Sequence, residues 1–492
     1  MSIDLESFIG QSKSEAPKAR KSILNTEKSD IDKYNEGKSY SYRYYADILK
    51  DVQVYMATTY QDILANSMTK TDKSLVKEYV NQYLITQNVR CRECADLTEL
   101  VDKLYKDMAE FSFITDWLEN ADKLKLEEIN INSWDDIEVI TDGEKYKAAE
   151  KFNDPQHAVD VVRRMLQVSN TVIDDGNPTA LGSLAKNIRI SALKSPVLDD
   201  DIGVAASIRI VGSKALSKEK LEEGTATEKM LEFLSAALRY GISICIAGNT
   251  GSGKTSTAGW LLSTIPDYKR IYTIEEGSRE FDLIRRNSVG AVRNSVIHTI
   301  TKSTVDGQND VTQEDLLDFS LRFDPDIICV GEMRSREAFA AQEASRTGHT
   351  VITTIHAKTA AGAYMRMTTL AKRAYEFSDD TLMKLMVEAF PIIVYQRQLE
   401  DHSRKITEII EGEDYRDGNV IYRTLFRYVV DENVVTDEGT SVVGHFEEPN
   451  GISERLKDEF LQNGAEKKTV DMFYTEKPMR RKTDAKPDIL FV

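Results

Sequence analysis

The chain has 492 residues, of which 29 % are charged and 41 % hydrophobic, a composition typical of a soluble protein with two or three domains. Its 64 basic and 81 acidic residues give a net charge of −17, which argues against a basic field over the whole surface for nucleic acid. The opening sequence MSIDLESFIG lacks an apolar core, so we expect no secretory signal, and no apolar run is long enough to predict a membrane span.

The chain has four cysteines, too few for a disulfide framework at this length, and we expect a reducing cytoplasm. Cys91 and Cys94 form a lone CxxC without a second pair or a suitable histidine. We interpret it as a small-residue stretch at the end of a helix, with metal binding as the alternative. Cys245 and Cys329 lie in apolar, strand-like runs and are expected to be inert core residues.

The first half of the chain changes its periodicity along its length. Residues 1–37 are polar and charged, and we expect them to be flexible. Residues 38–110 predict a helical extension, because apolar residues recur at spacings of three and four. Residues 111–211 predict an α+β domain, and residues 212–227, charged and punctuated by glycine, predict a linker. Within the α+β domain we expect strands at 128–132, 137–140, 188–190 and 206–211 and a helix at 155–168.

Strands and helices alternate from residue 228 to residue 465, which predicts an α/β domain with a doubly wound parallel sheet. Ligands of such sheets bind at the carboxyl ends of the strands. Residues 466–492 are charged, and we expect them to form a mobile tail. The expected parallel strands are 242–247, 270–275, 327–330 and 350–355, and the runs 391–395, 405–410 and 420–430 predict an antiparallel extension.

Residues 248–255 read GNTGSGKT, between an apolar strand and a predicted helix at 254–262, which is the pattern of a phosphate-binding loop. Glycines let backbone N–H groups turn inward around phosphate oxygens, and the helix N-terminus favours an anion. We predict that Lys254 reaches the β- and γ-phosphates of ATP and that the Thr255 hydroxyl ligates Mg²⁺. The expected phosphate-binding set is Gly248, Asn249, Thr250, Gly251, Ser252, Gly253, Lys254, Thr255 and Ser256.

Carboxylates follow two of the apolar strands. Glu332 comes after the run 327–330, and beside the loop strand it would face the γ-phosphate. There it can hold Mg²⁺ with Thr255, or orient and deprotonate the attacking water. Glu275 and Glu276 end another strand, where neighbouring carboxylates are costly unless a cation lies between them. Glu332, Glu275, Glu276 and Lys254 are therefore the predicted catalytic residues.

Two of the six histidines bracket the predicted strand 350–355. His349 precedes it and His356 ends it, and a lone histidine is usually a structural residue. Because one end of the strand faces the nucleotide, we predict that His356 senses the γ-phosphate or relays a proton, and we include His349 among the nucleotide-binding candidates.

In this order, GNTGSGKTS, YTIEE, LRFDPDIICVGEMRSREA and TGHTVITTIHAKTAAGA resemble the Walker A, Asp box, Walker B and His box of the traffic ATPases of type II and type IV secretion and pilus assembly. The similarity is strongest to the tight-adherence (Flp) pilus and type IV secretion branch, and it covers about residues 112–400. The Asp box departs from the usual I-E-D, because Glu276 replaces the aspartate and the next acid falls one residue late, at Glu280. Residues 287–310 diverge from the arginine-rich stretch of the family.

The resemblance implies a RecA-like ATPase domain behind the smaller N-terminal domain, a homohexameric ring, and a nucleotide held between the two domains. From the strand pattern alone, Arg189 and Arg209 are expected to face solvent. The resemblance instead implies that both contact the nucleotide phosphates, a role that suits the bidentate guanidinium of arginine. Arg293 and Arg322 are weaker candidates. The implied partners are inner-membrane platform proteins of a secretion or pilus machine, reached peripherally from the cytoplasm, with no stable nucleic acid.

Two other functions stay open at this point. A nucleic-acid motor, such as a DNA translocase, would need a basic lining that an acidic chain does not suggest. A nucleotide-gated scaffold without turnover is disfavoured by the presence of Lys254, Thr255 and Glu332 together.

Overall fold

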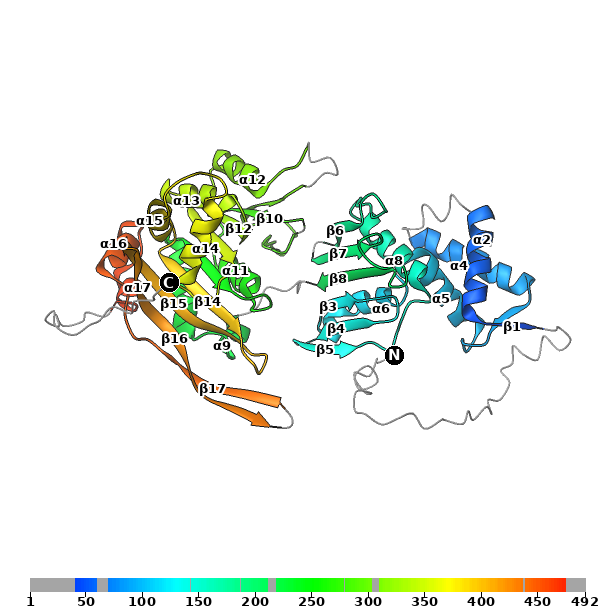
Figure 1. The fold of residues 1–492 in the computed structure, drawn as a ribbon. Helices are drawn as coiled ribbons and strands as arrows, with labels where there is room; N and C mark the ends of the chain where they lie inside the picture. The colour runs from blue at the N-terminus through cyan, green and yellow to red at the C-terminus, as the bar shows by residue number, and fades with distance from the viewer. Residues whose placement is uncertain are drawn as a thin grey trace. The chain divides into compact units, whose positions relative to one another are not determined.

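The chain forms two compact units, residues 1–211 and 212–492 (Figure 1). The predicted flexible segment 1–37 lies outside the described residues, as do the tail beyond residue 474 and residues 212–217 of the predicted linker. The computed structural model describes residues 40–59, 70–141, 143–185, 187–210, 218–277, 279–302, 309–436 and 439–474.

The predicted helical extension contains helices α2 (Tyr45–Thr59), α4 (Lys70–Thr86) and α5 (Leu97–Ala109). Two short parallel strands, β1 (Ser41–Arg43) and β2 (Val89–Cys91), complete it. Apolar residues at helical spacing form its core, as the pattern predicts. The fully buried members include Val52, Met56, Val76, Val80, Leu84, Leu100 and Leu104.

The CxxC pair lies in a different place from the one predicted. Cys91 ends strand β2, and Cys94 lies in the loop before α5, so neither thiol is at the end of a helix. The described residues contain no cluster of histidine, cysteine and acidic side chains that could hold a metal ion.

The α+β domain is a six-stranded antiparallel sheet with the order β5-β4-β3-β8-β7-β6. Helix α8 (Pro155–Gln167) packs its apolar side against one face of the sheet, and the short helices α6 (Ile114–Glu119) and α7 (Ala121–Leu124) lead into it. The four predicted strands are confirmed, whereas β5 and β6 were not predicted. The strands are β3 (Leu126–Ile131), β4 (Ile137–Thr141), β5 (Glu144–Lys147), β6 (Thr179–Ala185), β7 (Ile188–Lys194) and β8 (Val204–Ile210).

The second unit is built on a nine-stranded sheet with the order β11-β10-β12-β13-β9-β14-β15-β16-β17. The first six in this order are parallel, which confirms the doubly wound sheet, and the last three are antiparallel. The antiparallel extension is confirmed for the runs 405–410 and 420–430, but the run 391–395 belongs to β14, which pairs in parallel with β9. The strands are β9 (Ile244–Gly248), β10 (Arg270–Glu275), β11 (Ser295–Ile300), β12 (Ile327–Met333), β13 (Thr350–Ile355), β14 (Ile392–Gln398), β15 (Arg404–Arg416), β16 (Asn419–Thr436) and β17 (Gly439–Glu447).

Helices cover both faces of this sheet, so its central strands are buried on both sides. Strand β9 shows this, because Ile244 and Ile246 pack into one core while Cys245 and Ala247 pack into the other. The first core contains α10 (Glu228–Arg239), α11 (Lys254–Ser263) and α16 (Glu454–Gln462). The second contains α12 (Gln313–Ser320), α13 (Glu337–Arg346), α14 (Gly362–Ala371) and α15 (Asp379–Ala389).

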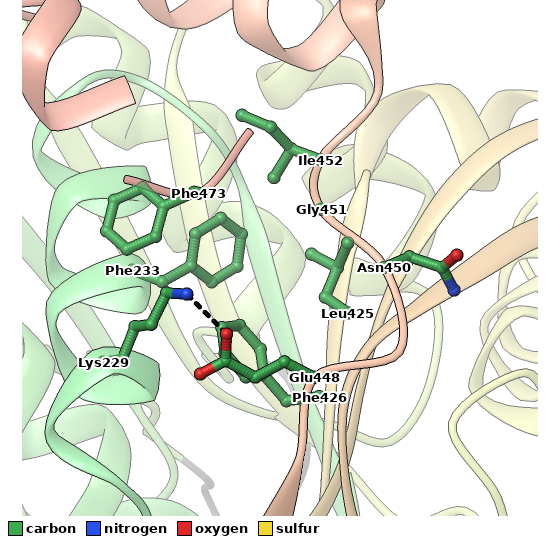
Figure 2. A pocket seen from close by; sticks show the side chains of 9 residues that line it. All are labelled: Lys229, Phe233, Leu425, Phe426, Glu448, Asn450, Gly451, Ile452 and Phe473. Carbon is green, nitrogen blue, oxygen red and sulfur yellow. Dashed lines mark hydrogen bonds and ion pairs between the residues drawn. The ribbon is translucent and has the colours of Figure 1, made fainter. Parts of the chain in front are cut away.

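Both ends of the second unit reach further than the sequence predicts. Residues 218–227 are packed on the unit, because α9 (Lys218–Glu222) buries Leu221 in the first core. At the other end, α17 (Lys467–Asp471) and Phe473 pack against α10, with the Phe473 ring 5.3 Å from the Phe233 ring (Figure 2). The linker and tail predictions were therefore wrong for these residues, because a few buried apolar groups outweigh their charged neighbours.

No helix among the described residues combines the length and the apolar character needed to cross a bilayer.

Candidate active site

The carboxyl ends of β9, β13, β12 and β10 meet at one edge of the sheet, in that spatial order. The GNTGSGKT loop follows β9, His356 follows β13, Glu332 lies near the end of β12, and Glu275 ends β10. The predicted motifs are thus brought together. Glu332 is nevertheless not on the strand next to the loop, because β13 pairs with both β9 and β12 and separates them.

The phosphate-binding loop depends on its glycines. Gly251 and Gly253 have φ values of 76° and 91°, a region that other residues rarely adopt. A Cβ atom at Gly248 would lie 2.1 Å from the carbonyl oxygen of Gln396, so the backbone approach there excludes any side chain. Helix α11 starts directly after Gly253, which has no side chain to cap the first N–H groups. Such a helix start is suited to an anion.

Lys254 is buried, and its ammonium group lies against the loop. Nζ donates hydrogen bonds to the carbonyl oxygens of Gly248, at 3.0 Å, and Asn249, at 2.8 Å. Thr255 follows it in the first turn of α11 and is half-buried, while Ser256 is exposed. The cation and the hydroxyl predicted to bind ATP and Mg²⁺ therefore lie at the mouth of one loop.

Glu332 and His356, which are 24 positions apart in the sequence, are in contact in the structure. Nε2 of His356 lies 3.1 Å from Oε1 of Glu332, and Nη2 of Arg334 donates to Oε2 of Glu332 at 2.8 Å. Burial is the largest influence on the pKa of Glu332 and raises it, but Arg334, His356 and Lys254 together outweigh burial and lower the pKa. The carboxyl group is therefore ionised at neutral pH.

The pKa of His356 is lowered, chiefly by burial and next by Lys254, against the opposing effect of Glu332. Its imidazole is therefore neutral at neutral pH. A neutral imidazole beside an ionised carboxylate can donate a hydrogen bond and hold the side chain in place.

Arg334 is a site residue that the sequence analysis missed. Besides Glu332 it binds Glu276, with Nη1 2.5 Å from Oε2. Its guanidinium thus forks between acids at the ends of two different strands, a geometry that suits arginine. Its position two residues after Glu332, in GEMRSR, was the available signal.

The two acids of the Asp box have different surroundings. Glu275 is 2 % exposed, and its Oε2 accepts hydrogen bonds from the backbone N–H groups of Glu280 and Phe281. Its Oε1 accepts from the Thr273 hydroxyl at 3.0 Å. Glu275 therefore anchors the loop after β10, and only Glu276 shares a partner with Glu332, because successive strand residues point to opposite sides.

His349 lies at the other end of the sheet. It precedes β13, which runs parallel to β9, so the strand places it about 20 Å from the edge that carries the loop. The structure therefore does not bring His349 to this chain's own loop, and its role as a nucleotide ligand stays a prediction. Arg293 and Arg322 likewise precede β11 and β12, and Arg293 is paired with Asp267 at 2.8 Å.

Arg189 and Arg209 belong to the first unit, where β7 and β8 place them directly opposite one another. Their strand neighbours Ile190 and Ile208 are buried against α8, so both arginines lie on the other face of the sheet. Glu128 is the register partner of Arg209 on its other side. Two like charges directly opposite each other are unfavourable unless an anionic group lies near them, and a contact with the nucleotide stays a prediction.

Comparison with known proteins places these features in a family. The sequence profile described as "Type II/IV secretion system protein" matches residues 155–428, more than half of the chain. The type IV secretion system protein VirB11 of Bartonella quintana is 30 % identical over 289 residues, which are 51 % of this chain and 78 % of the relative. The conjugal transfer protein TrbB of Rhizobium radiobacter is 30 % identical over 275 residues, 54 % of this chain and 77 % of the relative.

Among solved structures, the ATPase DotB of Legionella pneumophila is 19 % identical, with a TM-score of 0.44 over 73 % of this chain and 85 % of that one. The family assignment rests on the sequence match and not on this superposition.

Proposed function

The chain belongs to the type II/IV secretion family and is an ATP hydrolase, and from this premise we propose that it turns over Mg²⁺·ATP as a homohexamer to power a secretion or pilus-assembly machine. The observation that carries the proposal is the meeting of the GNTGSGKT loop, Glu332, Arg334 and His356 at one edge of the sheet. A phosphate loop and an ionised acid at one edge are the parts that in-line attack on a γ-phosphate requires.

The residues at this edge divide the chemistry among them. Lys254 exchanges its loop carbonyls for phosphate oxygens, and Glu332 takes a proton from the attacking water. Arg334 and His356 hold the Glu332 carboxylate in place. The Thr255 hydroxyl is a hard oxygen ligand that would hold Mg²⁺, and the Glu332 carboxylate would hold the water shell of the ion, which would supply charge neutralisation at the phosphates.

The finer parts of the proposal concern assembly. A nucleotide between the two units would place Arg189 and Arg209 on its phosphates, and closure of the units would be the work step. The like-charged pair on one sheet face supports this role. The expected partners are proteins of an inner-membrane platform, which a cytoplasmic, peripheral ring would contact.

The test uses the purified full-length chain. We expect ATP turnover that needs Mg²⁺ and stops in chelator, together with a mass of six copies in sedimentation velocity when nucleotide is present. Turnover that is unaffected by chelator, or full turnover by a monomer, would contradict the proposal. Strong stimulation by single-stranded or duplex DNA would instead favour a nucleic-acid motor.

A further inference from the structure

The first three residues of strand β15 contact two parts of the second unit that are distant in sequence. Nε of Arg404 donates a hydrogen bond to the carbonyl oxygen of Gly251, in the phosphate-binding loop, at 2.9 Å. Two residues later, the backbone N–H of Ile406 donates to the carbonyl oxygen of Thr225 at 2.8 Å. Thr225 lies in segment 218–227, the first described part of the chain after the first unit. One short stretch of strand therefore joins the loop to the segment that leads to the other unit.

The contact at Gly251 bears directly on anion binding. In a trans peptide the C=O and N–H groups point in opposite directions, so a donor on the Gly251 oxygen fixes the direction of the Ser252 N–H. In this structure that N–H makes a long hydrogen bond of 3.4 Å to the carbonyl oxygen of Asn249, which an anion would replace. The guanidinium of Arg404 is always charged. Beside the Gly251 oxygen it increases the dipole of the Gly251–Ser252 peptide, so the N–H of that peptide attracts an anion more strongly. Strand β14 holds the helix that follows the loop, because the hydroxyl of Thr257 in α11 donates to Oε1 of Gln396 at 2.9 Å.

Segment 218–227 packs against the first residues of β15. Leu221 and Ala226 are 1 % and 2 % exposed and share a core with Ile406. Nζ of Lys405 lies 3.2 Å from the place that a Cβ atom at Gly224 would occupy, so the Lys405 side chain lies against the segment there. A shift of this end of β15 must therefore move the segment, since close-packed groups transmit displacement.

We propose that Arg404 is a positioning residue of the nucleotide site and that residues 404–406 transmit the state of the phosphate-binding loop to segment 218–227. The inference rests on the proposed nucleotide turnover. It adds the contacts through which a structural change in the loop would reach segment 218–227. When phosphate oxygens replace the carbonyls on Lys254, the Gly251 peptide adjusts, and Arg404 carries that change to Ile406 and Thr225.

The experiment compares the full-length chain with Arg404→Ala, Arg404→Lys and the control Arg397→Ala. Arg397 is exposed on the same hairpin, and within the described part of the chain its guanidinium makes no hydrogen bond to the loop. We measure the Kd of a fluorescent ADP, and hydrogen exchange by mass spectrometry in peptides that cover residues 224–227 and 404–408. Loss of a hydrogen bond from a charged donor predicts about tenfold weaker binding in Arg404→Ala, a smaller loss in Arg404→Lys, and none in Arg397→Ala.

In the unsubstituted chain, saturating ADP should slow exchange in both peptides, and Arg404→Ala should abolish the slowing at equal saturation. Unchanged binding by Arg404→Ala would overturn the positioning role, and retained slowing would overturn the transmission. If Arg404→Ala fails to fold by circular dichroism, Arg404→Lys decides by the same two readouts. Failure of the unsubstituted chain and the control alike to bind ADP would contradict the proposed function itself, a result distinct from a defect confined to Arg404.

Discussion

Glu332 is held by two donors of different character, an arginine whose charge is permanent and a histidine whose imidazole is neutral. Its carboxylate is therefore oriented without being neutralised by a proton. Glu276, on the far side of Arg334, is 45 % exposed at its side chain and less constrained. At the scale of single residues, this difference favours Glu332 over Glu276 as the proposed base that prepares water.

Glu332→Gln should bind ATP and hydrolyse it about 10²- to 10⁴-fold more slowly, because the amide keeps the volume but removes the base. Single-turnover hydrolysis and nucleotide binding, measured on the same preparation, separate these effects. Glu276→Gln is the matched control and should lose far less. Retention of more than half the activity by Glu332→Gln would assign the base elsewhere, with Glu276 the next candidate.

The pH dependence of kcat follows from the same contacts. The pKa of Glu332 lies below its usual 4.5 and that of His356 below its usual 6.5, so neither group changes its charge as the pH rises through neutrality. We expect kcat to be level from about pH 7 to pH 8 and to fall on the acid side, first as His356 gains a proton and then as Glu332 does. An acid limb centred above the usual histidine value would contradict this.

At the scale of elements, the turn after β10 depends on a buried acid with a structural role. Glu275→Ala leaves the N–H groups of Glu280 and Phe281 without their acceptor and should cost about 1–3 kcal/mol of unfolding free energy. Glu275→Gln should recover most of this loss and most of the activity, because one amide oxygen can still accept both bonds. Urea unfolding and ATP turnover test the two parts. A Glu275→Gln variant that is stable but inactive would restore a catalytic role to Glu275.

The hydrophobic pattern predicted the strands that are fully buried and failed for a strand that is only partly buried. Strands β9, β12 and β13 are buried on both faces and stand out in the sequence. Strand β11 is an edge strand, half-buried along most of its length, and its sequence SVIHTI lies in a polar stretch. The sequence also gives no order of strands, which is why β13 was not expected between the loop and Glu332.

The sequence predicted those site residues that follow parallel strands, because the carboxyl ends of such strands meet at one edge of the sheet. Lys254, Glu332 and His356 follow this rule, whereas His349 precedes its strand. Arg334 and Arg404 were missed because a side chain that reaches across from another element leaves no periodic signal. The different surroundings of Glu275 and Glu276 likewise depend on the backbone of residues 280 and 281, which a motif does not specify.

At the scale of the whole molecule, the paired arginines of the first unit are the prediction that spans both units. Arg189→Ala with Arg209→Ala should lower turnover by about 10³-fold if they contact phosphate, and lysine should rescue poorly because it lacks a planar fork. Arg163→Ala, on helix α8 of the same unit, is the control, since Arg163 is paired with Asp160 at 2.9 Å. Turnover and sedimentation are measured together, and full activity in an assembled double variant would show that both are ordinary surface residues.

The central claim, that the GNTGSGKT loop is the site of ATP turnover, is tested most directly by the steady-state ATPase rate of full-length Lys254→Ala beside the unsubstituted chain. Nζ of Lys254 donates to the carbonyl oxygens of Gly248 and Asn249 in the loop, at the edge of the sheet, so we expect its removal to leave the fold intact by circular dichroism. We predict that hydrolysis is abolished in this folded variant, because the cation that serves the β- and γ-phosphates is lost. An unchanged rate in a folded Lys254→Ala chain would contradict the account.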